Sequence, residues 1–216
     1  MIDEVVLPVC INAQFIRHKK TFMYYRVTDN VLSFILFDKK SFGFEGGIYI
    51  QPLYIPSESL VLNLGNEVWC IADRSADNYR LYLDMEPDKI TKNIESCAIF
   101  LKKTAFDWFD KVGSPKGISD YILSNAKESS WFFTPDKWKN EAKAYSDLYL
   151  GKYETSIKSF ERFISELAKD NVGSWVDETI KNVKTLVALV KTEPNKINEM
   201  LLQTANEMRK TLEITA

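Results

Sequence analysis

The pattern of hydrophobic and polar positions changes once along this chain, and the change separates a strand-rich part from a helical part. Between residues 20 and 56, three runs rich in aromatic and β-branched residues are separated by turn signals. The polar turn Thr28-Asp29-Asn30 joins the run at 21–27 to the run at 31–38, and a third run follows at 48–54. Runs of this kind predict consecutive strands of an antiparallel sheet.

The second run, residues 31–38, is apolar on both alternating phases, which is typical of a strand covered on both faces. The third run contains Pro52, which predicts a position toward the edge of the sheet because proline cannot donate to a central ladder. Gly46-Gly47 precedes this run and predicts a turn or a bulge. Further strands or edge pieces are expected among residues 60–64, 67–72 and 79–83.

Farther along the chain, apolar residues recur every three or four positions, as they do in helices. Such a stripe runs through residues 87–112, with Pro87 in the first turn and Gly113 at the stop. We expect this long helix to cover the sheet. A shorter helix is predicted at 115–124. Residues 2–17 are interpreted as a short helix, with a strand after Pro8 as the alternative.

The remainder predicts an all-helical tail, with helices near 136–149, 152–169, 175–192 and 195–213. The aromatic run Trp131-Phe132-Phe133 follows a polar stretch, and we expect it to hold the tail against the first domain. The predicted fold class is therefore α+β. Residues 1–127 form an antiparallel meander covered by helices, and residues 128–216 form a helical bundle or tetratricopeptide-like hairpins.

Composition narrows the class of protein. The chain has 28 Lys and Arg against 30 Asp and Glu, a formal net charge of -2, which disfavours non-specific binding to nucleic acid. A local basic patch from residues 17–20 with Lys39-Lys40 is the open alternative. The N-terminus lacks the basic residues of a secretion signal, and no apolar run approaches the ~20 residues that span a bilayer. We expect a cytoplasmic protein that does not enter membranes.

The three cysteines, Cys10, Cys70 and Cys97, are odd in number and far apart. This spacing argues against a disulfide framework and against a zinc site. Each cysteine has apolar neighbours in the sequence and is interpreted as a small core residue.

The segment from residue 144 to 160 resembles one degenerate tetratricopeptide unit. Tyr153, Ser156 and Phe160 match the aromatic, small, aromatic spacing of the second helix of that repeat. The small residue lets two helices approach, and the aromatic rings fill the groove between them. A solenoid of this kind needs about three stacked units, and no second copy is visible. A plain helical hairpin is therefore the preferred interpretation.

A second resemblance covers about residues 10–125. It is carried by Phe22, Tyr24-Tyr25-Arg26, the run at 48–56, Gly65 and the segment at 109–112. Together these resemble a family of bacterial proteins known only as a domain of unknown function. The resemblance implies a fold type and a bacterial source, and it assigns no catalytic residue to this chain.

The sequence offers few groups for catalysis. His18 is the one histidine, so sites with several histidine ligands are excluded. Its cationic neighbours disfavour protonation, and we interpret it as a solvated residue rather than as the partner of Cys10. Gly46-Gly47 lacks the lysine of a phosphate-binding loop. The acidic residues are scattered along helices, so no catalytic residue, metal or cofactor is predicted.

A binding surface is the sharper hypothesis. The strand residues Tyr24, Arg26, Tyr49, Gln51 and Tyr54 combine apolar area with hydrogen-bonding tips, and tyrosine and arginine are enriched where proteins recognise partners. The preferred alternative is that their rings pack beneath helices while the polar tips reach solvent.

We therefore expect a non-enzymatic protein that binds a protein or peptide partner. One form of this hypothesis is an immunity protein that neutralises a toxin. The competing hypothesis is an enzyme or a small-ligand-binding protein with a pocket between sheet and helices. The sequence does not determine the oligomeric state.

Overall fold

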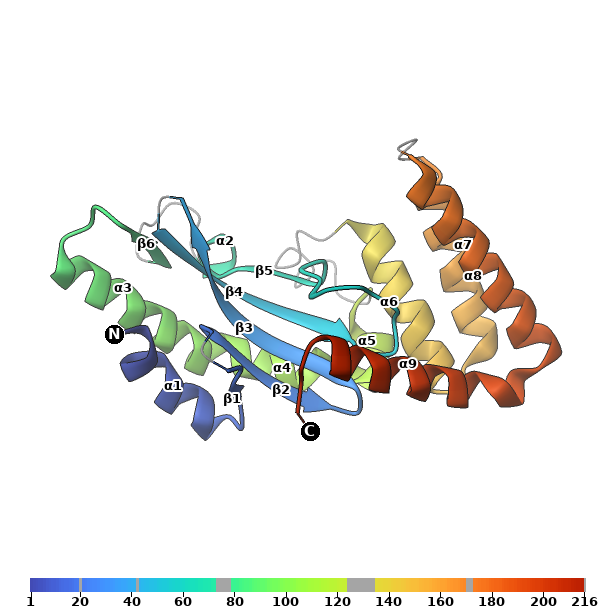
Figure 1. Cartoon of the computed structure of the whole chain (residues 1–216), viewed down its shortest axis with the longest axis horizontal. Helices are drawn as coiled ribbons and strands as arrows, with labels where there is room; N and C mark the ends of the chain where they lie inside the picture. Colours follow the sequence, from blue (N-terminus) through green and yellow to red (C-terminus); the bar gives the residue numbers. More distant parts are fainter. Residues whose placement is uncertain (20, 42, 73–78, 124–134, 170–172, 216) are drawn as a thin grey trace.

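The computed structural model describes residues 1–19, 21–41, 43–72, 79–123, 135–169 and 173–215, and it has the predicted α+β fold (Figure 1). Its antiparallel sheet has the strand order β1-β2-β3-β4-β5, with β6 paired to β4. The strands are β1 (Ile16–Arg17), β2 (Met23–Thr28), β3 (Val31–Lys40), β4 (Gly43–Pro52), β5 (Gly65–Glu67) and β6 (Arg80–Tyr82).

Helices make up most of the remaining structure. One long helical run passes under the sheet as α3, the π-helical segment η2 and α4, and the tail forms a group of helices at one end of the molecule (Figure 1). The helices are α1 (Ile2–Asn12), α2 (Val68–Ala72), α3 (Pro87–Phe100), η2 (Leu101–Ala105), α4 (Phe106–Val112), α5 (Pro115–Tyr121), α6 (Asp136–Tyr149), α7 (Tyr153–Leu167), α8 (Ser174–Thr192), η4 (Pro194–Lys196) and α9 (Ile197–Thr211).

The predicted hairpin between the first two long strands is confirmed. Thr28 pairs with Val31, so β2 and β3 are joined by a two-residue turn. Asp29 and Asn30 hold φ angles of 47° and 65°. Two successive residues in the left-handed region give the turn whose twist matches that of the strands, and Asn and Asp tolerate this conformation. The predicted N-terminal helix is also present, as α1, with Pro8 inside it.

The prediction that Pro52 places its strand toward an edge is wrong. β4 pairs with β3 along its whole length and with β5 and β6 on its other side, so it lies inside the sheet. The proline is tolerated because it is the last residue of β4, where the ladder ends at the Val31–Pro52 pair. A proline in the sequence indicates that the hydrogen-bonded ladder is interrupted there. In this protein the interruption is the end of β4.

The Gly46-Gly47 pair forms neither a turn nor a bulge, contrary to prediction. Both glycines lie within β4, in register with Phe37 and Leu36. A Cβ atom on Gly47 would lie 2.4 Å from the Tyr49 ring, and one on Gly46 would lie 3.0 Å from the Phe37 ring. The absence of a side chain at these two positions therefore leaves room for the rings of Tyr49 and Phe37. Of the three weaker runs, residues 79–83 contain β6, as predicted. The prediction is wrong for 67–72, where only Glu67 belongs to β5 and the rest forms the helix α2, and for 60–64, which form no strand.

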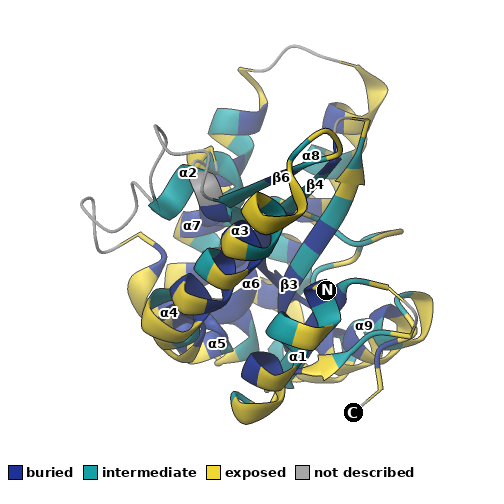
Figure 2. Ribbon diagram, turned by 90° about the vertical axis from the view of Figure 1, so that its left-hand side faces the viewer, coloured by how far each residue is buried: buried dark blue, intermediate teal, exposed yellow. Residues whose placement is uncertain are grey.

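β3 is covered on both faces, as predicted. Phe34 and Ile35 point to opposite faces and both have 0% exposure. One cover is the long helical run, which passes beneath the sheet and turns buried residues toward the interior (Figure 2). Ile94, Leu101 and Phe109 of this run are buried. Val112 is buried near its end, and the helix stops at Gly113 as the sequence indicates.

The other cover comes from the loop after β4 and from the end of the chain. The backbone amide of Ser57 in this loop donates to Met208 of α9 at 3.3 Å. Tyr25 of β2 shares a hydrogen bond with Thr215 at 2.8 Å. The tail thus returns to the sheet, and Figure 1 shows the C-terminus beside β2. The predicted contact through Trp131-Phe132-Phe133 and the predicted boundary at 127 lie outside the described residues.

The predicted hairpin between α6 and α7 is confirmed. The Ser156 hydroxyl is fully buried and donates to the Ala144 carbonyl at 2.8 Å, so the two helices approach closely at this small residue. The rings of Tyr145 and Phe160 meet edge to face beside it, with centroids 5.0 Å apart. α9 then packs against α6, which brings the end of the tail back onto the first helix of the group.

We expect Ser156→Leu to lower the free energy of unfolding by about 1 to 3 kcal/mol, because the larger side chain forces α6 and α7 apart. The control Ser156→Ala removes only the hydrogen bond and is expected to cost about 1 kcal/mol. Urea denaturation followed by circular dichroism measures both. Equal stability of Ser156→Leu and the wild type would contradict the close approach.

Candidate functional site

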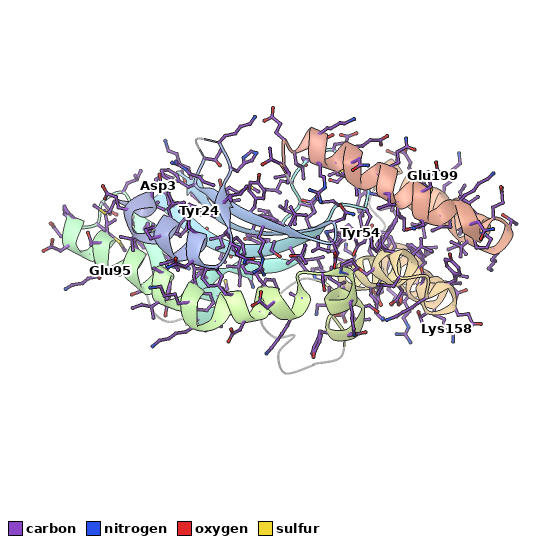
Figure 3. All side chains as sticks on the ribbon, turned by 90° about the horizontal axis from the view of Figure 1, so that it is seen from below. Asp3, Tyr24, Tyr54, Glu95, Lys158 and Glu199 are labelled. Carbon is purple, nitrogen blue, oxygen red and sulfur yellow. The ribbon has the colours of Figure 1, made fainter. Side chains whose placement is uncertain are left out.

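The structure does not bring the five predicted site residues together. Tyr24 and Arg26 lie on the face of the sheet that α1 and α4 cover. The Tyr24 hydroxyl donates to Asp3 at 2.6 Å, and Figure 3 shows these two side chains side by side. Arg26 donates to Asp110 of α4 at 2.6 Å, and its guanidinium lies 5.0 Å from the centroid of the Phe15 ring.

The other three residues have structural contacts elsewhere. Tyr49 stacks on Phe34 on the opposite face of the sheet, with ring centroids 5.5 Å apart. Gln51 accepts a hydrogen bond from the Val61 amide at 3.0 Å and so fixes the loop after β4. Tyr54 is fully buried at the junction with the tail, where it shares a hydrogen bond with Ser146 at 2.7 Å (Figure 3). Of the five, Arg26 and Gln51 each line a cavity.

Arg26 belongs to a groove at the outer edge of β2. The groove has a volume of about 340 Å³. Its floor comes from β2, one wall from the turn between α1 and β1, and the other wall from α9 and the C-terminal segment. We call it the two-arginine groove, and it is lined by Gln14, Ile16, Tyr25, Arg26, Val27, Arg209 and Thr215.

Each arginine of this groove has one buried N–H group without an acceptor among the described residues. Arg209 donates through Nε and Nη2 to the Asn30 side chain, at 3.3 and 2.9 Å, and its Nη1 has no acceptor among the described residues. Arg26 has no described acceptor for its Nε. Asp110, the ion-pair partner of Arg26, is 64% exposed, and no described carboxylate forms an ion pair with Arg209. A carboxylate entering the groove therefore meets an excess of positive charge.

The C-terminal segment holds the second wall in place. Thr215 donates its backbone amide to the Tyr25 hydroxyl at 3.2 Å, and Nε2 of His18 lies 3.2 Å from the Leu212 carbonyl oxygen. His18 is thus partly buried against this segment. The sequence predicted a solvated residue instead. The nearby cations are paired, Arg17 with Asp3 and Lys19 with Glu213. Lys40 pairs with Asp38. Three cations of the alternative basic patch thus have acidic partners, and Lys20 lies outside the described residues.

A second cavity lies between the end of β4, the loop that follows it and α6. Its volume is about 160 Å³. Most of its lining is apolar, and the charged group in the lining is Glu141 of α6. We call it the Glu141 pocket, and it is lined by Ile50, Gln51, Pro52, Ile55, Pro56, Ser57, Val61, Asn63, Leu64, Trp138, Glu141 and Ala142.

The carboxyl group of Glu141 sits in an environment that disfavours its charge. It makes no hydrogen bond or ion pair with the residues that the structure describes. Burial raises its pKa from the ordinary value of 4.5 to about 7, since the ionised form loses solvation there. Burial, together with the Glu141 carboxylate one turn away, also raises the pKa of the Tyr145 phenol, which stays neutral.

A third polar cluster joins α5 to α6 and α7. The Ser119 hydroxyl donates to the fully buried Asp147 at 2.5 Å and accepts from Lys152 at 2.9 Å. Lys143 pairs with Asp147 at 3.0 Å and donates to the Ser119 carbonyl at 2.8 Å. A serine beside a lysine is one arrangement for nucleophilic catalysis. Here Ser119 is 6% exposed, and its hydroxyl both donates and accepts within the cluster, so the cluster acts as a structural clamp.

Cys10 and Cys97 are buried, as predicted, and burial raises the pKa of both thiols to about 12, which makes them unreactive. Cys70 is partly buried, and its thiol lies 3.5 Å from Glu67. Within the described residues, no cluster of three or more histidine, cysteine or acidic side chains is placed to hold a metal ion. Among the helices so described, none is both long enough and apolar enough to span a bilayer.

The comparisons with known proteins identified no relative of this chain. No protein-family model, curated protein or solved structure matches this chain. The resemblance to a domain of unknown function and the tetratricopeptide-like spacing therefore remain predictions, and the case for a functional site depends on the geometry above.

We expect Glu141→Gln to stabilise the protein at pH 8 and to have little effect at pH 4.5. The folded-state pKa of Glu141 lies above its unfolded value, so the wild type loses stability as pH rises through about 7. The neutral variant lacks this loss, which amounts to at most about 3 kcal/mol. Chemical denaturation of both proteins across this pH range measures the difference. A difference that does not depend on pH would contradict the assignment.

We expect Asp147→Ala to lower the free energy of unfolding by about 3 kcal/mol, because it leaves Lys143 and Ser119 without their buried acceptor. The control Glu193→Ala removes the exposed ion pair with Lys196 and is expected to change stability by about 0.5 kcal/mol or less. Thermal or urea denaturation compares them. Similar losses for the two variants would show that the cluster is no clamp.

Proposed function

We propose that this chain is a binding protein that takes up an acidic, extended segment of a protein partner in the two-arginine groove. The observation that carries the proposal is the pair of guanidinium groups, from β2 and α9, that line one groove, where no described carboxylate forms an ion pair with Arg209. Carboxylates are the complement of such groups, because guanidinium presents its donors in a planar fork that matches two carboxylate oxygens.

Charge distribution supports an acidic ligand. The chain as a whole has a formal charge of -2, so a net positive groove stands out against its surroundings. Arg209 is bonded to the neutral Asn30 side chain, which orients the guanidinium without cancelling its charge. Orientation before binding reduces the entropy lost when a ligand is held.

The edge of the sheet supports an extended protein segment as the ligand. β1 pairs with β2 only at Tyr24 and Tyr25, so no described strand pairs with the outer side of Val27. Val27 and the exposed Ile16 also give the groove apolar surface next to its positive charge. A segment that alternates acidic and apolar residues would satisfy both features by lying along this edge.

The test uses a synthetic peptide of alternating valine and glutamate, with a matched peptide of valine and glutamine, titrated into the full chain by calorimetry. We expect the acidic peptide to bind and the neutral peptide to bind at least about tenfold more weakly, since charge-assisted hydrogen bonds are lost. Arg209→Gln is expected to weaken the acidic peptide by about tenfold or more for the same reason.

The matched control is Lys158→Gln, which removes an exposed positive charge on α7. Figure 3 shows Lys158 at the other end of the molecule from Tyr24 of β2. It is expected to bind the acidic peptide as the wild type does. Weaker binding by Arg209→Gln is attributed to the lost guanidinium only if this variant retains the melting temperature of the wild type. Equal binding by the two variants, or equal binding of the two peptides, would refute the proposal.

A further inference from the structure

The Glu141 pocket is a separate feature from the two-arginine groove, with which it shares no lining residue. Ile50 and Pro52 of β4, Ile55, Val61 and Leu64 of the loop, and Trp138 of α6 make its walls apolar. A cavity of about 160 Å³ is comparable to the roughly 150 Å³ engineered cavity that takes up benzene. Its size therefore suits a small ring or a short chain.

One charged group faces this apolar space. The Glu141 carboxyl is the acidic group in the lining, and no described side chain pairs with it. A carboxylate that has lost solvation and has no partner is stabilised by a cation that enters beside it. Ser57 and Asn63 add neutral polar groups to the lining, and the Gln51 side chain is already bonded to the loop.

The ring of Trp138 adds aromatic surface to the cavity. Its side chain lies one helical turn from Glu141 and lines the same cavity. The Lys137 ammonium lies 5.0 Å from the centroid of this ring, so the ring already has a cation–π contact in the structure. A single carboxylate is too few oxygen ligands for calcium or magnesium, which points to an organic cation.

We propose that the Glu141 pocket binds a small apolar molecule that carries one protonated primary amine. The apolar body occupies the space between β4, the loop and α6, and the ammonium group pairs with the Glu141 carboxylate. This inference does not depend on the function proposed for the two-arginine groove.

Binding is expected to depend on pH through Glu141. The other ionisable groups near it are the Tyr145 phenol, which stays neutral, and Lys137, whose charge lies at the Trp138 ring. The β4 and loop residues of the lining contribute no ionisable side chain. Protonation of Glu141, with its pKa of about 7, removes the charge that pairs with the amine, so affinity is expected to fall as pH is lowered.

The experiment titrates the full chain with benzylamine and with its neutral analogue benzyl alcohol, followed by calorimetry or by chemical-shift changes. We expect benzylamine to bind the wild type at pH 8 at concentrations below about 10 mM, the range of weak small-ligand binding. Affinity at pH 5.5 is expected to be lower by about 30-fold, the ratio that proton competition gives for the pKa above.

Two variants make the outcome specific. Glu141→Gln keeps the shape of the pocket, so it is expected to weaken benzylamine by about tenfold or more, to remove the pH dependence and to leave benzyl alcohol unaffected. Val61→Phe fills the cavity and is expected to abolish binding of both compounds. Melting temperatures confirm that each variant is folded.

Failure of benzylamine to bind the wild type would overturn the proposal. So would equal affinity of the wild type and Glu141→Gln for benzylamine, which would identify an apolar cavity without selectivity for cations. Retention of both compounds by Val61→Phe would place their binding elsewhere on the protein.

Discussion

The architecture of this protein depends on one constraint, the burial of β3 on both faces. Phe34 and Ile35 are adjacent residues on opposite faces, and neither reaches solvent. A strand of this kind needs two covers, because exposing either row of side chains would return a large apolar area to water. The helical run α3-η2-α4 supplies one cover, but it cannot reach around the sheet to supply the other.

The second cover is assembled from distant parts of the chain, and both candidate sites lie where it meets the sheet. The loop after β4 is fixed by Gln51 and meets α9 at Met208, whereas the final residues meet β2 at Tyr25. Between these contacts the packing is incomplete. The two-arginine groove lies at the seam along β2, and the Glu141 pocket lies at the seam between β4 and α6. Both cavities thus lie where the second cover closes over the sheet.

The long strands and helices were predictable from the sequence, because the hydrophobic patterns that indicate them are local. The apolar runs gave β2, β3 and β4, and the stripe from Ile94 to Val112 gave the long covering helix. The turn or bulge predicted at Gly46-Gly47 was wrong because these glycines make room for the rings of Phe37 and Tyr49. In the sequence, such a pair cannot be distinguished from the glycines of a turn. The edge position predicted from Pro52 was wrong because a proline is found both at the end of a strand and in a strand at the edge of a sheet.

The candidate sites were harder to predict, since their residues meet only through tertiary structure. Arg26 was recognised from its strand, but Arg209 has the position of an ordinary basic residue in the last turn of a helix, and its partner Asn30 is 179 residues away. Glu141 was missed for a related reason. The polar sequence of α6 reads as a solvated surface, yet the helix packs against α5, α7 and α9 and buries polar residues such as Asn140 and Asp147.

The clamp around Ser119 and Asp147 has a consequence for chain connectivity. It ties α5 directly to α6 and α7 through side chains, and Tyr54 with Ser146 adds a second tie between the sheet and α6. These buried side-chain contacts fix the positions of the sheet, α5 and the first two tail helices relative to one another, so a substitution in the cluster is felt in all of these elements.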